Sequence, residues 1–125
     1  MTARRRNSTP EADFQRTLVQ WLRAVLPMGA IIHHSASEQK EKTRQAILVG
    51  MGVYPGFSDL LVLSGGKILF LECKSKAGRQ SFAQMRFQAL VEAQGFPYAI
   101  VRTLDDALGA LRDAGFYLRL KGGRA

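Results

Sequence analysis

Two acidic residues and a lysine have the types and spacing to do chemistry together: Asp59, Glu72 and Lys74. Asp59 directly precedes the apolar run 60–63, and Glu72 directly follows the apolar run 68–71. If these runs pair as strands, the two carboxylates oppose each other, which destabilises a sheet unless something compensates their charge. A divalent cation bound through oxygen ligands would compensate it. The pattern therefore predicts a metal site with an ammonium group beside it.

The turn between the two runs decides whether the acids meet. Gly65-Gly66 predicts a tight hairpin, because glycine takes positive φ at both turn positions without a steric penalty. If Ser64 lies opposite Lys67, side chains alternate with period two and the acids share one face of the sheet. A three-residue loop would place them on opposite faces. The expected ladder pairs Leu63 with Ile68, Leu61 with Phe70, and Asp59 with Glu72.

A simpler interpretation is that these charges protect an exposed strand edge from aggregation, since Glu-x-Lys is common on strands. The continuous apolar runs argue against it, because such runs are typical of strands covered on both faces. Cys73 alternates with Glu72 and Lys74, so we expect it on the opposite face, packed as a small apolar residue.

Composition indicates a single globular domain. The chain has 125 residues, of which 46% are hydrophobic, and its longest apolar runs are far shorter than a membrane span. The N-terminal MTARRRNSTPE has no apolar segment after its charges, so we expect no secretory signal and a cytoplasmic location. One cysteine rules out an internal disulfide and disfavours a cysteine-rich zinc site. We expect a flexible basic tail at 1–7 and one domain over 8–125.

The charge balance predicts a polyanionic partner. Lysine and arginine number 18 against 10 acidic residues, a net charge of +8. Such an excess favours nucleic acid through phosphate neutralisation, although it also serves general solubility. Two basic clusters are candidates for nucleic-acid binding, and one of them adjoins the paired acids: Lys40, Lys42 and Arg44, and then Lys76 and Arg79.

The remaining elements are expected to build an α/β domain. We predict a helix opened by a Ser8-x-x-Glu11 capping box, a strand at 30–34, and a helix within 35–51. Ser81 caps a helix over 82–94, a strand follows at 96–102, and Thr103 caps a last helix. The segment 117–120 is expected to add a short edge strand. The predicted buried side of the 82–94 helix consists of Phe82, Met85, Ala89, Leu90 and Ala93.

Glu11 has two candidate roles: reciprocal capping of the first helix, or support of the metal site. Gln84 and Gln88 project from one side of their helix, because they are four residues apart. His33 and His34 face opposite sides of a strand, so they cannot both ligate one metal.

Together these features resemble the PD-(D/E)XK nucleases and, more narrowly, the VRR-NUC (virus-type replication-repair nuclease) domain. Three stretches carry the resemblance: GVYPGFSDLLVL (52–63), LECKSKAGRQSFAQMRF (71–87) and GFPYAIVRT (95–103). Asp59 matches the aspartate of the family's first motif, and Glu72-Cys73-Lys74 matches the Glu-x-Lys motif that follows it. Ser58 stands where the motif usually has proline, and we expect this to alter turn geometry alone.

The resemblance implies a restriction-endonuclease-like core, a mixed β-sheet flanked by helices. It implies a Mg²⁺- or Mn²⁺-dependent nuclease in which Asp59, Glu72 and the backbone carbonyl of Cys73 hold the cation. Lys74 would position the attacking water or offset phosphoryl charge. Gln84 would orient either that water or Lys74. Glu11 resembles a first-helix acid that supports the metal. Family members further suggest a homodimer that cuts branched DNA such as four-way junctions, and a phage setting in a host cytoplasm.

Two other functions are alternatives for the same residues. A non-catalytic nucleic-acid-binding subunit explains the positive charge but not the joint presence of Asp59, Glu72 and Lys74. A restriction-type subunit that cleaves only with a partner explains both.

Overall fold

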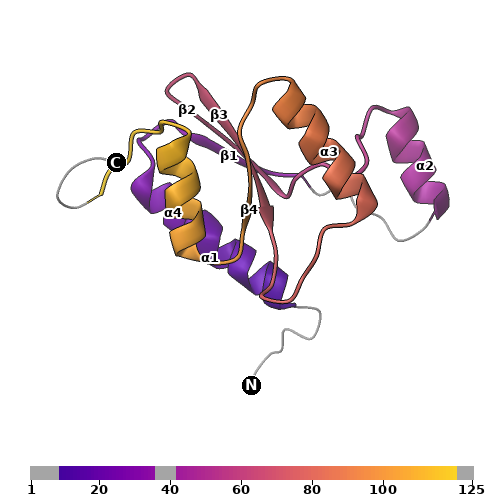
Figure 1. Ribbon diagram of the computed structural model, residues 1–125, viewed down its shortest axis with the longest axis horizontal. Coiled ribbons are helices and arrows are strands. Elements are labelled where there is room, and N and C mark those ends of the chain that lie inside the picture. Colours follow the sequence, from indigo (N-terminus) through magenta and orange to yellow (C-terminus); the bar gives the residue numbers. More distant parts are fainter. Residues whose placement is uncertain (1–8, 36–41, 121–125) are drawn as a thin grey trace.

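The computed structural model describes residues 9–35 and 42–120, with side chains from residue 46 onward in the second part. Within these residues the chain forms one four-stranded sheet and four helices (Figure 1). The helices are α1 (Pro10–Val25), α2 (Lys42–Gly50), α3 (Phe82–Ala93) and α4 (Leu104–Asp113). The strands are β1 (Ile31–His34), β2 (Leu60–Ser64), β3 (Lys67–Cys73) and β4 (Tyr98–Val101). The predicted mixed sheet flanked by helices is confirmed.

The strand order is β1-β2-β3-β4, with β1, β2 and β3 antiparallel and β4 parallel to β3. Gly65 and Gly66 have φ of 59° and 79°, so the turn uses the backbone region that favours glycine. Ser64 pairs with Lys67, as expected for a two-residue turn. The predicted hairpin and its register are confirmed.

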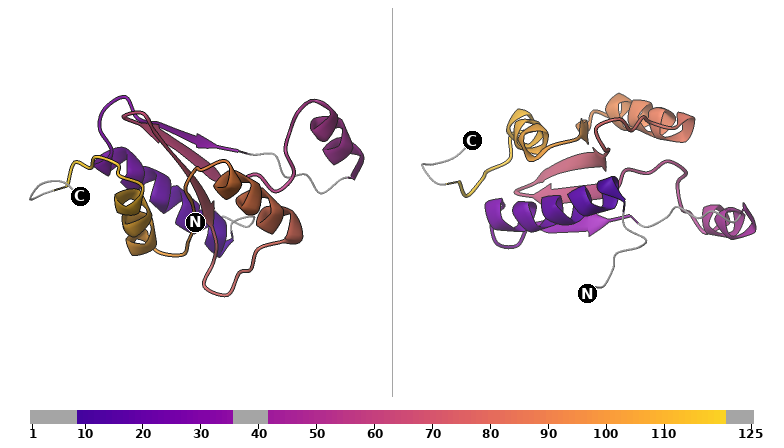
Figure 2. Two further views of the ribbon diagram at one scale, coloured as in Figure 1. Left: turned by 45° about the horizontal axis from the view of Figure 1, so that its top comes forward. Right: turned by 90° about the horizontal axis from the view of Figure 1, so that it is seen from below.

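One face of the sheet carries the hydrophobic core. Figures 1 and 2 show α1 and α4 on this side, with α3 on the other. Each fully buried leucine or valine contributes about 1.5–3 kcal/mol relative to exposure, so this face supplies most of the packing energy. The core residues include Leu18 and Leu22 of α1, Leu60 and Val62 of β2, Leu69, Leu71 and Cys73 of β3, Val101 of β4, and Leu111 of α4.

The opposite face is covered by α3 through an aromatic cluster centred on Phe87. Its ring lies 4.5 Å from Phe57, 5.8 Å from Phe70 and 6.0 Å from Tyr98, measured between centroids. Tyr54 joins the cluster at 5.7 Å. Both faces of the central strands are therefore covered, as their continuous apolar runs predict.

The predicted buried side of α3 is wrong. Phe87 and Val91 are its buried residues, whereas Phe82 is 83% exposed and Met85 and Leu90 are also exposed. The helix carries apolar residues around most of its circumference, so periodicity alone does not select a face. The aromatic cluster sets the rotation of the helix and turns its glutamines toward the end of β3.

Two local predictions also need correction. The N-cap of α1 is Thr9, whose hydroxyl accepts from the Ala12 amide, so Glu11 takes no part in a capping box. Ser8 lies outside the described residues. The segment 117–120 forms an isolated bridge at Leu120 but adds no strand to the sheet, and the Arg119 amide donates to the Val25 carbonyl.

The helix predicted within 35–51 is α2, which covers residues 42–50; residues 36–41 lie outside the described part of the chain. It stands apart from the sheet beyond α3 (Figures 1 and 2). Among helices in the described ranges, none has both the length and the apolar character of a membrane span.

Gly56 holds the loop before β2 against the first turn of α3. Its φ is +77°, and a Cβ there would lie 2.3 Å from the carbonyl oxygen of Ala83. We predict that Gly56→Ala destabilises the fold by more than about 2 kcal/mol, because positive-φ strain of about 1–2 kcal/mol adds to a backbone clash. Urea unfolding followed by circular dichroism measures this.

Gly95→Ala is the matched control. Gly95 has φ of +90° but nothing within 4 Å of the added carbon. Gly95→Ala should lower the free energy of unfolding only by the positive-φ strain of about 1–2 kcal/mol. Equal losses for both variants would contradict the close approach at Gly56.

Candidate active site

The two predicted acids meet where the β2–β3 ladder ends. Leu60 pairs with Leu71, so Asp59 and Glu72 oppose each other one step further along. Asp59 Oδ2 accepts a 2.7 Å hydrogen bond from the Cys73 amide. The backbone oxygen of Asp59 in turn accepts from the Ser35 amide at 2.9 Å. Asp59 is therefore fixed from both neighbouring strands.

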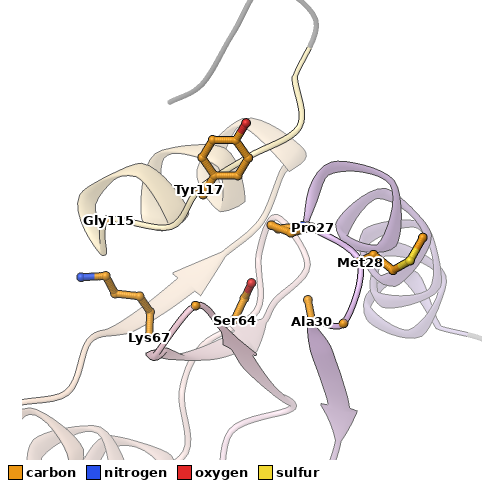
Figure 3. A pocket seen from close by; sticks show the side chains of 9 residues that line it. Pro27, Met28, Ala30, Ser64, Lys67, Gly115 and Tyr117 are labelled. Carbon is orange, nitrogen blue, oxygen red and sulfur yellow. The ribbon is translucent and has the colours of Figure 1, made fainter.

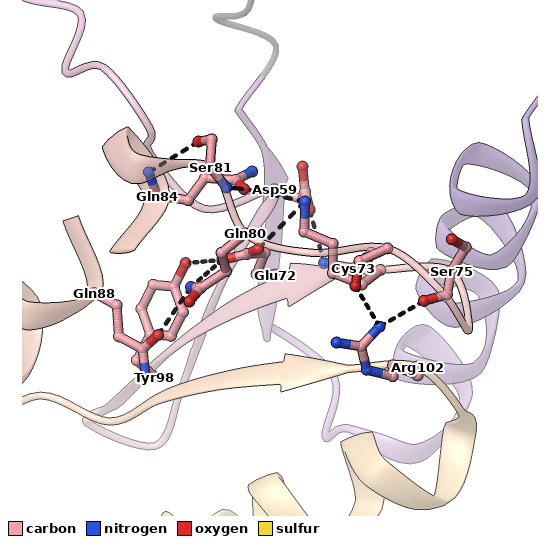
Figure 4. A network of polar contacts seen from close by, with 12 residues as sticks. Asp59, Glu72, Cys73, Ser75, Gln80, Ser81, Gln84, Gln88, Tyr98 and Arg102 are labelled. Atoms are coloured by element: carbon pink, nitrogen blue, oxygen red, sulfur yellow. Dashed lines mark hydrogen bonds and ion pairs between the residues drawn. The ribbon is translucent and has the colours of Figure 1, made fainter. Parts of the chain in front are cut away.

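Glu72 is completely buried, with 0% of its surface exposed. Its Oε1 accepts a 2.9 Å hydrogen bond from Gln80 Nε2 and a second, short one from the Tyr98 hydroxyl (Figure 4). Its Oε2 has no hydrogen-bond partner. The nearest cation to Oε2 is Lys74 Nζ at 3.5 Å. One carboxylate oxygen is thus held by two donors while the other is left without one.

Gln84 holds the lysine. Lys74 is 8% exposed, and its Nζ donates to Gln84 Oε1 at 3.0 Å. The same oxygen accepts from the Ser81 amide at 2.9 Å, while Ser81 Oγ accepts from the Gln84 amide. Gln84 therefore closes the capping box of α3 and ties the start of that helix to Lys74.

A single arginine organises the loop that follows β3. The guanidinium of Arg102 donates to the carbonyl oxygens of Ser75 at 2.6 Å and Gly78 at 2.8 Å (Figure 4). Lys76 and Arg79 lie in this loop and are exposed. These two predicted nucleic-acid-binding residues are therefore at the edge of the site.

Lys42 and Arg44 belong to α2, which stands apart from the sheet (Figure 1), and their side chains are outside the described part of the chain. Lys40 also lies outside the described residues.

Glu11 approaches the site from α1. Its Oε2 lies 2.9 Å from where a Cβ on Gly78 would stand, so the absence of a side chain at Gly78 makes room for it. The negative charge of Glu11 also contributes to the raised pKa of Asp59, less strongly than that of Glu72.

Burial and neighbouring charges shift three titrating groups. Burial raises the pKa of Asp59, the Cys73 amide opposes this, and the charges of Glu72 and Glu11 add to the increase. Burial, followed by the charge of Asp59, raises the pKa of the Cys73 thiol to about 12, so this cysteine is no thiolate nucleophile at neutral pH. Burial and the hydrogen bond to Glu72 raise the pKa of Tyr98, which keeps its hydroxyl a donor.

The donor set suits a hard divalent cation. It consists of the carboxylate oxygens of Asp59 and Glu72. A fully buried carboxylate oxygen without a hydrogen-bond donor is costly, and Glu72 Oε2 is such an atom, with only the Lys74 ammonium 3.5 Å away. No group of three or more His, Cys, Asp or Glu side chains in the described ranges gathers as a metal cluster. Water would therefore have to complete an octahedral shell, as Mg²⁺ commonly requires.

Three residues of the site were not anticipated from the sequence. Gln80 and Tyr98 hold Glu72, and His34 Nδ1 lies 3.0 Å from the backbone oxygen of Asp59 and 3.0 Å from Gln15 Nε2. For Tyr98, the sequence gives one indication of its position: side chains alternate along a strand, which places Tyr98 and Ile100 on the same face of β4. Their register against β3, with Ile100 opposite Glu72, is not readable from the chain.

Two surface hollows lie in different parts of the molecule. One, of about 380 Å³, lies at the hairpin turn, where Lys67 and Tyr117 line it and no acidic residue does (Figure 3). The other, of about 410 Å³, is lined by Glu11, Gln15 and His34 among others. Neither Asp59 nor Glu72 lines it, and its link to the paired acids is the contact of His34 with the backbone oxygen of Asp59.

Taken together, the mixed sheet and its paired acids define an α/β domain with a carboxylate-lined site at the end of a hairpin. Comparison of the sequence with protein-family models and with curated proteins gave no match. Solved structures do match. A "VRR_NUC domain protein" superposes with a TM-score of 0.67 at 20% identity, over 86% of this chain and 89% of that one. A "VRR_NUC domain" superposes with a TM-score of 0.58 at 20% identity, over 87% of this chain and all of that one. The chain therefore has the VRR_NUC fold.

We predict that Asp59→Asn raises the thermal unfolding midpoint of the chain in EDTA at neutral pH, by about 3 °C or more. The fold raises the pKa of Asp59, so its ionised form is disfavoured by burial and by Glu72. The asparagine oxygen can still accept from the Cys73 amide.

The gain should depend on pH. Below the ordinary aspartate pKa of about 3.8, wild-type Asp59 is protonated in both states and the variants should be equally stable. The wild type loses stability as pH rises from there through the raised folded-state pKa, so the asparagine advantage grows and then stays constant. Differential scanning calorimetry across this range tests it. An advantage that is independent of pH would contradict the raised pKa.

Proposed function

We propose that this chain is a nuclease that hydrolyses phosphodiester bonds in DNA with the help of Mg²⁺ or Mn²⁺. The observation that carries the proposal is the buried Oε2 of Glu72, which accepts no hydrogen bond, lies 3.5 Å from Lys74 Nζ and has Asp59 opposite it. The VRR_NUC fold and the net charge of +8 support it.

The cation would be held by Asp59, by Glu72 through Oε2, and by the backbone carbonyl of Cys73. Glu11 would support it from α1. A bound Mg²⁺ or Mn²⁺ would supply Lewis-acid activation of a water molecule and of the scissile phosphate. Such an ion also explains how two opposed carboxylates are stable at one end of a sheet.

The protein residues then have separate roles. Lys74 places a positive charge beside the phosphoryl oxygens, where negative charge develops during attack. Gln84 keeps that ammonium in place and orients it. The buried position of Lys74 matters, because a charge excluded from water acts more strongly on its neighbours.

The loop 75–80 would hold the nucleic-acid backbone through Lys76 and Arg79. Contacts of this kind position a phosphate chain without reading its bases. The proposed substrates are therefore selected by structure, branched DNA and four-way junctions being the leading candidates. We also propose Lys40, Lys42 and Arg44 as backbone contacts from the region of α2.

A homodimer would present two such sites to a two-fold junction. We propose this assembly, acting in the cytoplasm of a host cell, as the biological form. A non-catalytic nucleic-acid binder or a subunit dependent on a partner are the alternatives that the experiments must exclude.

The direct test is cleavage of a labelled panel consisting of a four-way junction, a flap, a linear duplex and a single strand. We predict cutting with Mg²⁺ or Mn²⁺, none with EDTA, and a loss of at least about 10³-fold in Asp59→Ala. Binding of the same DNA should persist in the variant. Binding without cutting by the wild type in either metal would contradict a self-sufficient nuclease.

Lys74→Ala should separate chemistry from metal binding. We predict a loss of cleavage of about 10²–10³-fold, the size expected when one electrostatic stabiliser is removed. Mn²⁺ affinity measured by calorimetry should fall little, or should rise, because the lysine competes for Glu72. Arg86→Ala, which removes an exposed cation from α3, is the matched control and should retain cleavage.

A further inference from the structure

The hydrogen bonds of Glu72 are distributed unequally between its two oxygens. Oε1 accepts from both the Tyr98 hydroxyl and Gln80 Nε2, and Oε2 accepts from neither. A carboxylate oxygen has two lone pairs in its plane. Two donors therefore occupy the acceptor capacity of Oε1 and leave Oε2 as the single oxygen available to a cation.

The orientation of Gln80 is itself determined. Gln80 Nε2 also donates to Gln88 Oε1 at 2.9 Å (Figure 4). Gln88 Nε2 in turn donates to Glu92 Oε2 at 3.1 Å. The carboxylate of Glu92 only accepts hydrogen bonds. It therefore directs the NH₂ group of Gln88 outward and the carbonyl of Gln88 toward Gln80, so Gln80 presents its NH₂ group to Glu72.

This arrangement bears on which cation can bind. Ca²⁺ takes six to eight oxygens and often uses both oxygens of one carboxylate, whereas Mg²⁺ takes six at short distances and keeps several waters. A glutamate limited to one oxygen meets the smaller ion's requirement and withholds a ligand from the larger one. We propose that Tyr98 and Gln80 are positioning residues that leave Glu72 one metal-binding oxygen and thereby favour Mg²⁺ or Mn²⁺ over Ca²⁺. The proposal rests on the metal-dependent function above.

The test is calorimetric titration of the full chain with Mn²⁺ and, separately, with Ca²⁺, with no DNA present. The variants are Tyr98→Phe, which removes only the donated hydroxyl, and Gln80→Ala, with thermal unfolding as a check of folding. Tyr54→Phe is the matched control, because that ring also contacts Phe87 but is 44% exposed. Wild type and control should bind Mn²⁺ more tightly than Ca²⁺.

In Tyr98→Phe the Mn²⁺ affinity should fall by about 10-fold, the usual cost of losing a residue that orients a metal ligand. The Ca²⁺ affinity should stay level or rise, because Oε1 becomes available for two-oxygen binding. Gln80→Ala should change the ratio of affinities in the same direction.

Equal loss of both affinities would overturn the proposal, since it would reveal a general structural role. Unchanged affinities would overturn it as well, while leaving the metal-dependent nuclease intact. Failure of the wild type to bind either ion would overturn both this proposal and the metal-dependent function.

Discussion

The burial of the Glu72 carboxylate is the constraint on which the rest of the site depends. Removing a charged group from water is expensive unless hydrogen bonds and opposite charge replace the water. Tyr98 and Gln80 replace it at one oxygen, and Lys74 faces the other. These partners come from β4, from the loop before α3, and from the residue that follows β3, so all three segments must be in place before the carboxylate is satisfied.

The two faces of the central hairpin have different roles. The face of Leu60, Leu71 and Cys73 packs against α1 and α4 and supplies the hydrophobic core. The face of Phe70 and Glu72 packs against α3, and beyond its aromatic cluster the side chains become polar. Because side chains alternate between the two faces along β3, Glu72 points away from the core, while its neighbours Leu71 and Cys73 are packed within it. The site is polar but rests on a rigid apolar support.

Local patterns were enough to predict much of this architecture. Gly65-Gly66 determined the hairpin, its register brought Asp59 opposite Glu72, and alternation placed Cys73 in the core. The residue types and the Glu-x-Lys spacing pointed to the same acids. These features depend on neighbours in the chain, where short-range rules are strong.

Long-range packing was less accessible to prediction. The apolar residues of α3 surround most of the helix, so its buried face follows from the aromatic cluster around Phe87, which is assembled from distant segments. Tyr98 reaches Glu72 because of a parallel register that leaves no local signal. At the start of α1, two adjacent residues could each cap the helix, and Thr9 does so. That choice leaves Glu11 near Gly78 and Asp59, at the site rather than at the helix cap.

The central claim is that the buried oxygen of Glu72 exists to bind a cation together with Asp59. Anomalous diffraction from crystals soaked in Mn²⁺ tests it most directly, because the scattering locates the ion without any assumption about activity. The account predicts one strong anomalous peak within coordination distance of Asp59 and of Glu72 Oε2, with Oε1 still hydrogen-bonded to Tyr98. Crystals that bind Mn²⁺ elsewhere, or that leave Glu72 Oε2 facing only Lys74 at saturating Mn²⁺, would contradict it.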